Sequence, residues 1–431
     1  MKICATGDSL FLSKMPQEYD ADFKSVTEYI SKADVKITNL ETNVSKFGDF
    51  ANQYSGGTWL NVEPEVFEDL TKFGFDYYGT ANNHCMDYSY HGLLSTIAEL
   101  DKRGLLHSGT GKDLKEASRP AIMSKDGKKI AIFAFDTSHQ APSKAGYETK
   151  SLKGRPGVNY LDSETYYPIG KEDFLHLREI AEKSAVNVKR NLSIKGGFQL
   201  SDPEGVFDFG GVKFCYDGSK KRTECNKKDK ERILNDIKSA KQICDYVVVL
   251  IHCHGIGVLG HEDVPEYFEE IARASIDAGA CAIIGSGTHQ LKPIEIYKGC
   301  PIFYSLGDFI YQGMSVPVLP ADFMVKYGVD IDSTAHAGLM ARSKNGKIGL
   351  QTEKCNFLSV IPFMEFSDEG KLIKLELMPI SLGFEKPGAL FGLPSLAKSS
   401  DATEIFNTLV RLSNPYGTRL YLDDGMIKVE I

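Results

Sequence analysis

Side chains that can bind a metal ion follow five apolar runs of this chain, at the point where each run ends. They are Asp8 in ATGDSLF, Glu41 in ITNLET, Asn83 and His84 in TANNHCMD, His252 and His254 in IHCHG, and His289 in GSGTHQLKP. Carboxylate, amide and imidazole ligands together suit a divalent zinc, manganese or iron ion. A lone histidine after a strand is more often a capping or core residue, so the prediction of a metal site depends on the five strand ends together.

Short apolar runs with the pattern of β-strands alternate with amphipathic stretches that have helical spacing. The expected strands are 2–6, 34–40, 75–80, 129–135, 245–251, 280–285 and 300–304, and the expected helices are 22–31, 63–73, 92–103 and 264–278. This alternation predicts a layered α/β fold with a partly parallel sheet. Because ligands bind where parallel strands end, we expect the metal-binding side chains to meet at one edge of the sheet.

Two segments depart from this alternation. The pattern weakens at about 140–240, where we expect an insertion or cap in a catalytic α/β domain of residues 1–313. Residues 314–431 contain turns such as Asn345-Gly346, an alternating strand at 372–377 and a helical pattern at 403–412. We therefore expect a β-rich C-terminal portion that packs on the core.

The composition is that of an ordinary globular protein, with 431 residues, 42% hydrophobic and 25% charged, and a formal net charge of −8. This charge gives no reason to expect nucleic acid or an anionic membrane as a partner. Nine scattered cysteines without a CxxC pair favour reduced thiols, and no apolar run reaches the length of a membrane span. We expect a cytoplasmic protein, and the oligomeric state stays open.

The order of the motifs resembles the CapA family, which is named for the synthesis of poly-γ-glutamate capsules. The motifs are GD, NLE, ANNHxxD, a strand that ends in His, GxxTH, and PIExYxGxPIFYSLGDF, and the C-terminal LSNPYGTRLYLDDGMIKVEI also resembles family members. The resemblance implies a sandwich fold similar to that of calcineurin-like metallophosphoesterases, with one or two divalent ions (Mn, Fe or Zn).

The resemblance also implies a role for each residue. One ion would be bound by Asp8 and His289, a second by Asn83 and His252, and both by Glu41. His84 would act as general acid or stabilise the transition state, and Asp87 would orient it. Two such ions can polarise a substrate oxygen and balance developing negative charge.

Three positions depart from the usual pattern of the superfamily or the family, and the one at Leu10 is itself usual in CapA-like chains. Leu10 stands where the superfamily usually has the histidine of Asp-x-His, and Gly287 stands where it has the first histidine of His-x-His. His254 could replace the lost ligand, since alternate strand residues share a side with His252, or it could be only a nearby polar residue. Asp308 replaces the usual Asn of YSLGNF and would add negative charge near the site.

The function that these residues favour is metal-dependent hydrolysis of a phosphoester or a peptide or γ-glutamyl amide. A metal that polarises a carbonyl can also assist other chemistry there, such as removal of the α proton. The substrate would be a small or peptide-like anion, and Asn82, Trp59, Arg155 and Asp308 are the candidate residues to bind it. Trp59 is equally suited to the core.

Two other functions compete with this one. Gly7-Asp8-Ser9-Leu10 matches a GDSL-type serine esterase with Ser9 as nucleophile, although no late Asp-x-x-His element supplies the base. A non-catalytic protein that binds an anionic polymer is the second alternative. The segment 219–232 carries seven Lys or Arg against three acidic residues, although a solvated surface explains this as well.

Overall fold

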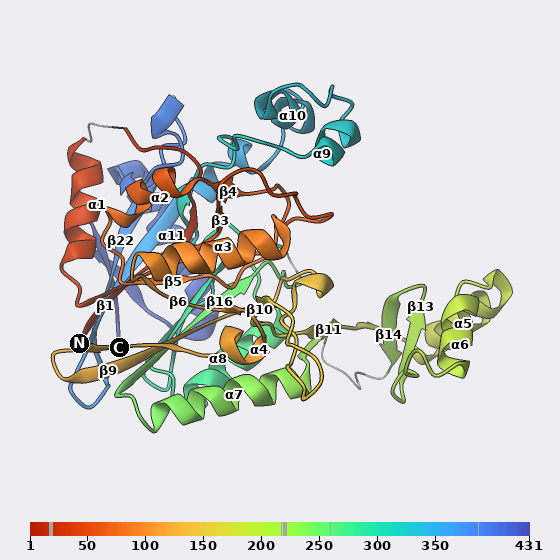
Figure 1. Ribbon diagram of the computed structural model, residues 1–431. Helices are drawn as coiled ribbons and strands as arrows, with labels where there is room; N and C mark the ends of the chain where they lie inside the picture. The colour runs from red at the N-terminus through yellow and green to blue at the C-terminus, as the bar shows by residue number, and fades with distance from the viewer. Residues whose placement is uncertain (17–19, 217, 219–221, 259, 387) are drawn as a thin grey trace.

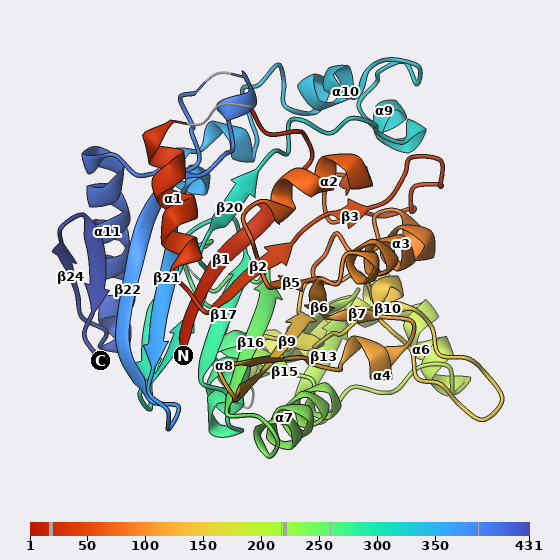
Figure 2. The same ribbon diagram turned by 60° about the vertical axis from the view of Figure 1, so that its left-hand side comes forward.

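The body of the protein consists of two β-sheets that face each other, with helices on their outer faces (Figures 1 and 2). This computed structural model describes residues 1–16, 20–216, 218, 222–258, 260–386 and 388–431. Buried side chains from both sheets, among them Ile37, Val248 and Ile284, pack together between them. The layered α/β sandwich expected from the sequence is confirmed.

The first sheet combines parallel strands from the N-terminal part with antiparallel strands from the C-terminal part. Its order is β24 (Leu420–Asp423), β25 (Met426–Val429), β22 (Leu372–Ser381), β21 (Leu358–Phe366), β1 (Lys2–Leu10), β2 (Val35–Leu40), β5 (Tyr77–Gly79) and β6 (Leu106–Ser108). β23 (Ser395–Leu396) pairs with β22, and β20 (Asp308–Tyr311) pairs with β1. Two strands pair with the same edge of β1. The start of β1 pairs antiparallel with β21, and its end pairs in parallel with β20.

The second sheet is parallel at its centre and antiparallel at its edges. Its order is β18 (Ile294–Tyr297), β19 (Cys300–Phe303), β17 (Ala282–Gly287), β16 (Tyr246–Cys253), β9 (Lys128–Asp136) and β8 (Ala121–Lys125). The register places His252 beside Asp136 on one side and Ser286 on the other. The ends of three parallel strands therefore lie level with one another.

Helices cover the outer face of each sheet because alternate strand residues point outward with apolar side chains. Val26 and Ile30 of α1 (Ala21–Ser31) and Phe67 of α2 (Pro64–Thr71) pack on the first sheet. Ile237 of α7 (Lys227–Lys241) and Ile271 of α8 (Glu266–Asp277) pack on the second sheet. Asp20 caps α1 by accepting a hydrogen bond from the backbone N–H of Phe23.

One longer helix, α3, and several short elements complete the body. They are β3 (Asn43–Val44), β4 (Asn61–Val62), α3 (Ser89–Lys102), β7 (Thr110–Gly111), α4 (Leu114–Ala117), the 3-10 turns Ala141–Ser143, Leu350–Thr352, Lys354–Phe357, Gly388–Leu390 and Asn414–Tyr416, and β10 (Gly157–Val158). The C-terminal part adds α9 (Ala321–Lys326), α10 (Ala335–Arg342) and α11 (Ser399–Ser413) to its strands.

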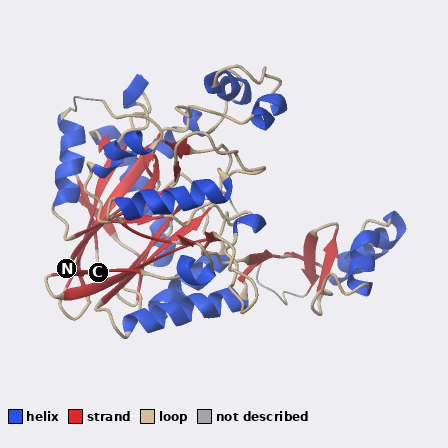
Figure 3. Ribbon diagram, in the orientation of Figure 1, coloured by secondary structure: helices blue, strands red, loops and turns tan. Residues whose placement is uncertain are grey.

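Part of the expected insertion forms an arm that stands away from the body (Figures 1 and 3). Its elements are β12 (Tyr167–Ile169), α5 (Lys171–Ser184), α6 (Val188–Lys195), β13 (Val206–Phe209) and β14 (Val212–Tyr216). The antiparallel pair β11 (Ser163–Thr165) and β15 (Thr223–Cys225) connects the arm to the body. α7 lies within the expected insertion range but packs on the main sheet.

Of the helices in the described residues, none is both long and apolar enough to cross a membrane.

Candidate metal centre and adjoining pocket

The metal-binding side chains expected at the strand ends come together between the two sheets. Asp8 is at the end of β1, Glu41 directly follows β2, and His252 is near the end of β16. His252 Nε2 lies 3.5 Å from Glu41 Oε1, and His252 Nδ1 lies 3.6 Å from Asp8 Oδ1. Residues more than 200 positions apart in the sequence thus share one buried site.

Two groups of these residues have ligand atoms close enough to hold one ion each. The first consists of Asp8, Glu41, His289 and Asp308, and the second of Glu41, His252 and His254. Within each group the ligand atoms lie within 4.8 Å of one another. Glu41 belongs to both groups, so it would be a ligand of either ion.

Glu41 has no hydrogen-bond partner among the described residues that would explain its burial. The residue is fully buried, and neither side-chain oxygen accepts a hydrogen bond from any described residue. Burial raises the pKa of Glu41 well above its usual range, and the nearby carboxyl groups of Asp8 and Asp308 raise it further. An uncompensated buried carboxylate is costly, and bound cations are one common compensation. These residues therefore fit a divalent ion.

Asp8 is held from two sides. The side-chain amide of Asn39 donates to Oδ1 at 2.6 Å, and the backbone N–H of Gly287 donates to Oδ2 at 2.8 Å. Burial alone would raise the pKa of Asp8, but the attraction and hydrogen bond from His252 outweigh it, so this pKa lies below its usual range. Asp8 is thus kept as a carboxylate, the form that binds metal.

Gly287 explains why the usual histidine is absent at this position. Its φ is +119°, and a Cβ atom there would lie 2.7 Å from the backbone of Cys253. A histidine would not fit this conformation. The position serves the site through its backbone N–H to Asp8 instead.

Asn83 lies beside His252 of the second group, which also contains His254. Asn83 Oδ1 lies 2.9 Å from His252 Nε2, and the Asn83 amide donates to the carbonyl of Gly56 at 3.0 Å. His254 Nε2 lies 4.0 Å from Glu41 Oε1 and has no hydrogen-bond partner among the described residues. Burial lowers the pKa of His254 well below its usual value, so the ring is neutral and its nitrogen is free to act as a ligand.

His289 and Asp308 form a pair beside the first group. His289 Nδ1 lies 3.0 Å and 3.1 Å from the two carboxylate oxygens of Asp308. Burial raises the pKa of Asp308 to about 6, against the lowering effect of His289. A carboxylate bound to one ring nitrogen fixes the orientation of the imidazole and leaves the other nitrogen for a metal.

His84 and Asp87 form a second such pair at the side of the site. His84 Nδ1 lies 2.6 Å from Asp87 Oδ2, and His84 Nε2 lies 3.9 Å from Glu41 Oε1. Asp87 also accepts hydrogen bonds from the backbone N–H groups of Gly56 and Leu60. The carboxylate is therefore fixed, and it aims the far nitrogen of His84 toward the centre.

Asp136 is a member of the site that sequence reasoning missed. It ends β9 beside His252 in the register, is fully buried, and its Oδ2 accepts no hydrogen bond from the described residues. Burial raises its pKa, and His252 opposes that effect. The signal was present, because Asp136 directly follows the apolar run KIAIFAF as the other site residues follow theirs.

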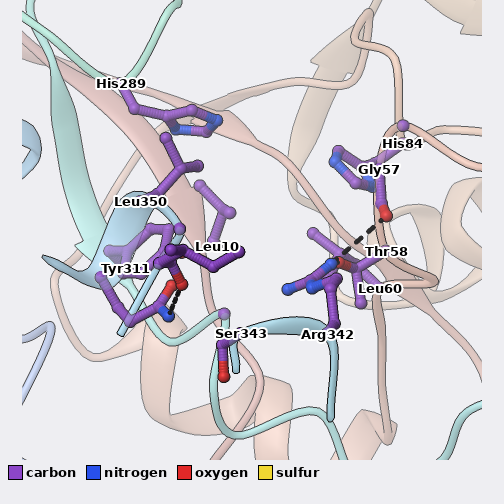
Figure 4. Close-up of a pocket in the computed structure, with 15 residues that line it drawn as sticks. Leu10, Gly57, Thr58, Leu60, His84, His289, Tyr311, Arg342, Ser343 and Leu350 are labelled. Carbon is purple, nitrogen blue, oxygen red and sulfur yellow. Dashed lines mark hydrogen bonds between the residues drawn. The ribbon is translucent and has the colours of Figure 1, made fainter. Parts of the chain in front are cut away.

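A pocket of about 280 Å³ adjoins this centre. The lining residues are Leu10, Gly56, Gly57, Thr58, Leu60, His84, His289, Tyr311, Gly313, Arg342, Ser343, Ile348, Gly349, Leu350 and Gln351. In Figure 4, His289 lies on one side of the pocket, and His84 and Arg342 lie on the other. The pocket therefore has the candidate catalytic histidine and a candidate metal ligand in its wall.

None of the four residues expected to bind substrate lines this pocket. Asp308 is fully buried beside His289. Asn82 donates to the carbonyl of Leu40, and its side-chain oxygen accepts from the backbone N–H of His84, so it positions the strand ends. Trp59 is 9% exposed, belongs to an apolar core and donates to the carbonyl of Asn52. Arg155 is exposed and donates to the carbonyl of Lys144.

The residues that the serine esterase and the polymer-binding protein would require are engaged in contacts within the protein. Ser9 is fully buried and its hydroxyl lies 2.8 Å from that of Thr38, so it is not placed as a nucleophile. In the basic segment, Lys230 pairs with Glu270 and Arg232 donates to Asn159. Residues 219–221 lie outside the described residues.

Comparison with known proteins identifies the family. The model of the family described as "Bacterial capsule synthesis protein PGA_cap" matches residues 2–313. The chain belongs to this family. "Uncharacterized protein y4sH" of Sinorhizobium fredii (strain NBRC 101917 / NGR234) is 32% identical over 99% of this chain and 92% of its own length. "PGA biosynthesis protein CapA" of Bacillus subtilis (strain 168) is 26% identical over 70% of this chain and 60% of its own length.

Solved structures are more distant. A putative 5'-nucleotidase from Staphylococcus aureus, solved in complex with alpha-ketoglutarate, aligns with a TM-score of 0.39 at 10% identity, over 93% of this chain and 55% of that one. Nothing about function follows from similarity at this level. The family assignment rests on the sequence matches, and the candidate metal centre rests on the geometry.

Proposed function

We propose that this family member is a metal-dependent hydrolase that acts on a phosphoester or on a peptide or γ-glutamyl amide. The observation that carries the proposal is Glu41, whose two buried oxygens accept no hydrogen bond from the described residues, and which belongs to both candidate ion groups. Buried carboxylates in this arrangement are stable when a cation compensates them. Manganese, iron and zinc fit the mixed oxygen and nitrogen ligands.

The residues divide into ligands and acid–base groups. Asp8, Glu41 and His289 would hold one ion, with Asp308 orienting His289, and Glu41, Asn83, His252 and His254 would hold a second. Such ions act as Lewis acids toward a carbonyl or phosphoryl oxygen. His84, held by Asp87, lies in the pocket wall where it can donate a proton to a leaving group.

The printed names of relatives suggest the substrate class. The Bacillus subtilis relative is called a PGA biosynthesis protein, and a Mycobacterium tuberculosis relative is called a probable polyglutamine synthesis accessory protein. We propose a small or peptide-like anionic substrate in line with those names. We also propose a cytoplasmic location, because the nine cysteines are scattered through the sequence without a CxxC pair, a usage that favours reduced thiols.

The second candidate function is a non-catalytic accessory protein that binds an anionic polymer. The word "accessory" in a relative's name favours it. The internal contacts of Lys230 and Arg232 argue against the basic segment as the binding surface. Metal content separates the two candidates, because an accessory role needs no ion.

The first experiment is to measure metal content by plasma mass spectrometry on protein purified without chelator or nickel affinity. We expect one or two equivalents of manganese, iron or zinc in the wild type, and less than half of that in Glu41→Ala. Glu179→Ala is the matched control, because this carboxylate is 61% exposed on the arm. A wild type that stays metal-free after incubation with each ion contradicts the proposal.

A further inference from the structure

Arg342 is the one arginine among the residues that line the pocket beside the metal centre. It is the last residue of α10 and is partly buried. In Figure 4 its guanidinium lies on the same side of the pocket as His84, across from His289 and Tyr311. A cation thus lines the cavity in which the candidate acid and a candidate metal ligand are found.

The charge of Arg342 is not compensated within the described part of the chain. Nη1 donates to the hydroxyl of Thr58 and, at 3.5 Å, to the carbonyl of Gly57, which are both neutral. No acidic side chain of the described residues forms an ion pair with Arg342, and its Nε and Nη2 have no hydrogen-bond acceptor there. The edge formed by Nε and Nη2 is the one that binds a carboxylate through two parallel hydrogen bonds.

The position of Arg342 is fixed by packing. Its guanidinium lies 5.6 Å from the ring centroid of Phe323 in α9, and Phe323 packs edge-on against Trp59. Leu339 of the same helix is fully buried in that core. Because the helix pair is anchored in this way, the guanidinium is held in place before a ligand binds.

The loop of residues 56–58 contacts Arg342 and also contacts the segment that carries His84 and Asp87. Gly56 precedes the two acceptors of Arg342, donates its N–H to Asp87 and accepts from the Asn83 amide. A Cβ atom at Gly56 would lie 2.6 Å from His84 Nε2, so a side chain there would close this side of the pocket. The distance between Arg342 and His84 is therefore set by one short, tightly held segment.

We propose that Arg342 binds a carboxylate on the non-reacting part of the substrate, while the reacting group faces the metal ligands. This proposal rests on the proposed metal-dependent function and names the substrate class more narrowly. A single guanidinium among apolar walls, including Leu10, Leu60 and Leu350, matches one negative charge better than the two of a phosphate. The pocket volume of about 280 Å³ suits a compact molecule or the end of a chain.

Arg342 and the candidate metal ligands lie in different parts of the chain. The family model matches residues 2–313, and Arg342 lies beyond that region. The metal ligands therefore belong to the region matched by the family, whereas the carboxylate site belongs to the helix pair α9 and α10 that follows it.

The test compares two acids that differ only in the second carboxylate. Calorimetry on manganese-loaded protein measures the affinities of glutarate and butyrate for the wild type, Arg342→Gln and Arg342→Lys. We expect the wild type to prefer glutarate by roughly tenfold to a hundredfold, the range of a charge-assisted hydrogen-bonded pair. Arg342→Gln should lose this preference, and Arg342→Lys should keep part of it because the charge stays and the fork geometry does not.

Controls separate this proposal from the proposed function. Arg419→Gln removes an arginine whose side chain is 81% exposed and should leave the glutarate preference unchanged. Metal content and thermal midpoint are measured on every variant, so that misfolding of Arg342→Gln is detected. If Arg342→Gln misfolds, the glutarate preference of Arg342→Lys tests the proposal in its place. Metal uptake without a glutarate preference, or a preference that survives Arg342→Gln, overturns the carboxylate site alone. A wild type that takes up no metal overturns both proposals.

Discussion

At the scale of single residues, the site separates side chains that bind ions from side chains that move protons. Glu41 and His252 lie within 3.5 Å of each other and belong to a candidate ion group. His84 is held by Asp87 and lines the pocket. Loss of a ligand and loss of an acid should therefore have different consequences that can be measured on the same protein.

His84→Gln tests this division. The amide cannot donate a proton as imidazole does, so we expect kcat to fall by roughly 10²–10⁴-fold, the usual contribution of general acid–base catalysis. Metal content should stay at the wild-type value, because His84 belongs to neither candidate ion group. The measurement pairs steady-state kinetics on a chromogenic phosphoester and a chromogenic amide with plasma mass spectrometry.

His252→Gln is the matched variant for that prediction. It changes the same residue type in the same site, but it removes a candidate ligand, so both metal content and kcat should fall. If His84→Gln loses as much metal as His252→Gln, then His84 is a ligand and its assignment as the acid is wrong.

At the scale of elements, the loop that follows β16 depends on a buried lysine. Lys292 is fully buried, and its ammonium group donates to the carbonyls of Gly255 and Asp263, at 3.0 Å and 2.7 Å. Burial lowers its pKa, against the raising effect of Cys253 and Asp263. Lys292 thus ties both ends of the loop that begins one residue after His254.

Lys292→Met should destabilise the protein and loosen this loop. The substitution keeps an apolar stem of similar length but removes the donor from the Gly255 carbonyl, at a cost of about 1–3 kcal/mol. The Asp263 carbonyl also loses the ammonium donor, but it keeps a hydrogen bond from the backbone N–H of Gly257. Urea unfolding measures the loss of stability, and metal titration measures the binding of a second ion, which should weaken because His254 is next to the loop. Lys298→Met is the control, since the Lys298 side chain is 62% exposed. Equal stability of Lys292→Met and wild type would show that the two hydrogen bonds do not hold the loop.

At the scale of the whole molecule, no described residue of the arm lines the pocket beside the candidate metal centre. The residues that line the pocket lie at positions 10–84 and 289–351, and none of the described residues between 137 and 241 is among them. The arm joins the body through the antiparallel pair of β11 and β15, in which Thr165 lies opposite Thr223. The backbone of Tyr166 also donates to the carbonyl of Arg222 at 2.7 Å.

Replacement of residues 167–221 by Asn-Gly should therefore leave the metal centre intact. Residues Tyr166 and Arg222 are already hydrogen-bonded neighbours, and an Asn-Gly turn is compatible with an antiparallel pair. We expect unchanged metal content and kcat on small substrates, checked by mass spectrometry and kinetics. Loss of metal binding in a folded deletion variant would show that the arm supports the site.

Local sequence pattern predicted the strands and the residues at their ends. Asp8, Glu41, His252 and His289 could be named because each follows an apolar run, and parallel strands end at the same edge of a sheet. The expected strand 129–135 is β9, Lys128–Asp136 in the structure, and the expected helix 92–103 is α3, Ser89–Lys102. These elements are encoded by local periodicity, which one sequence contains in full.

The sequence by itself determined the alternation of strands with helices and the family motifs. Together these identified most of the candidate ligands. Only the tertiary structure decided the strand pairing that placed Asp136 beside His252, and the packing of distant elements that brought Asp308 to His289 and Arg342 into the pocket wall. It also assigned Trp59 and Ser9 to buried packing. The physical reason is that local pattern records which side of an element is apolar, whereas contacts between distant elements depend on how those sides pack together.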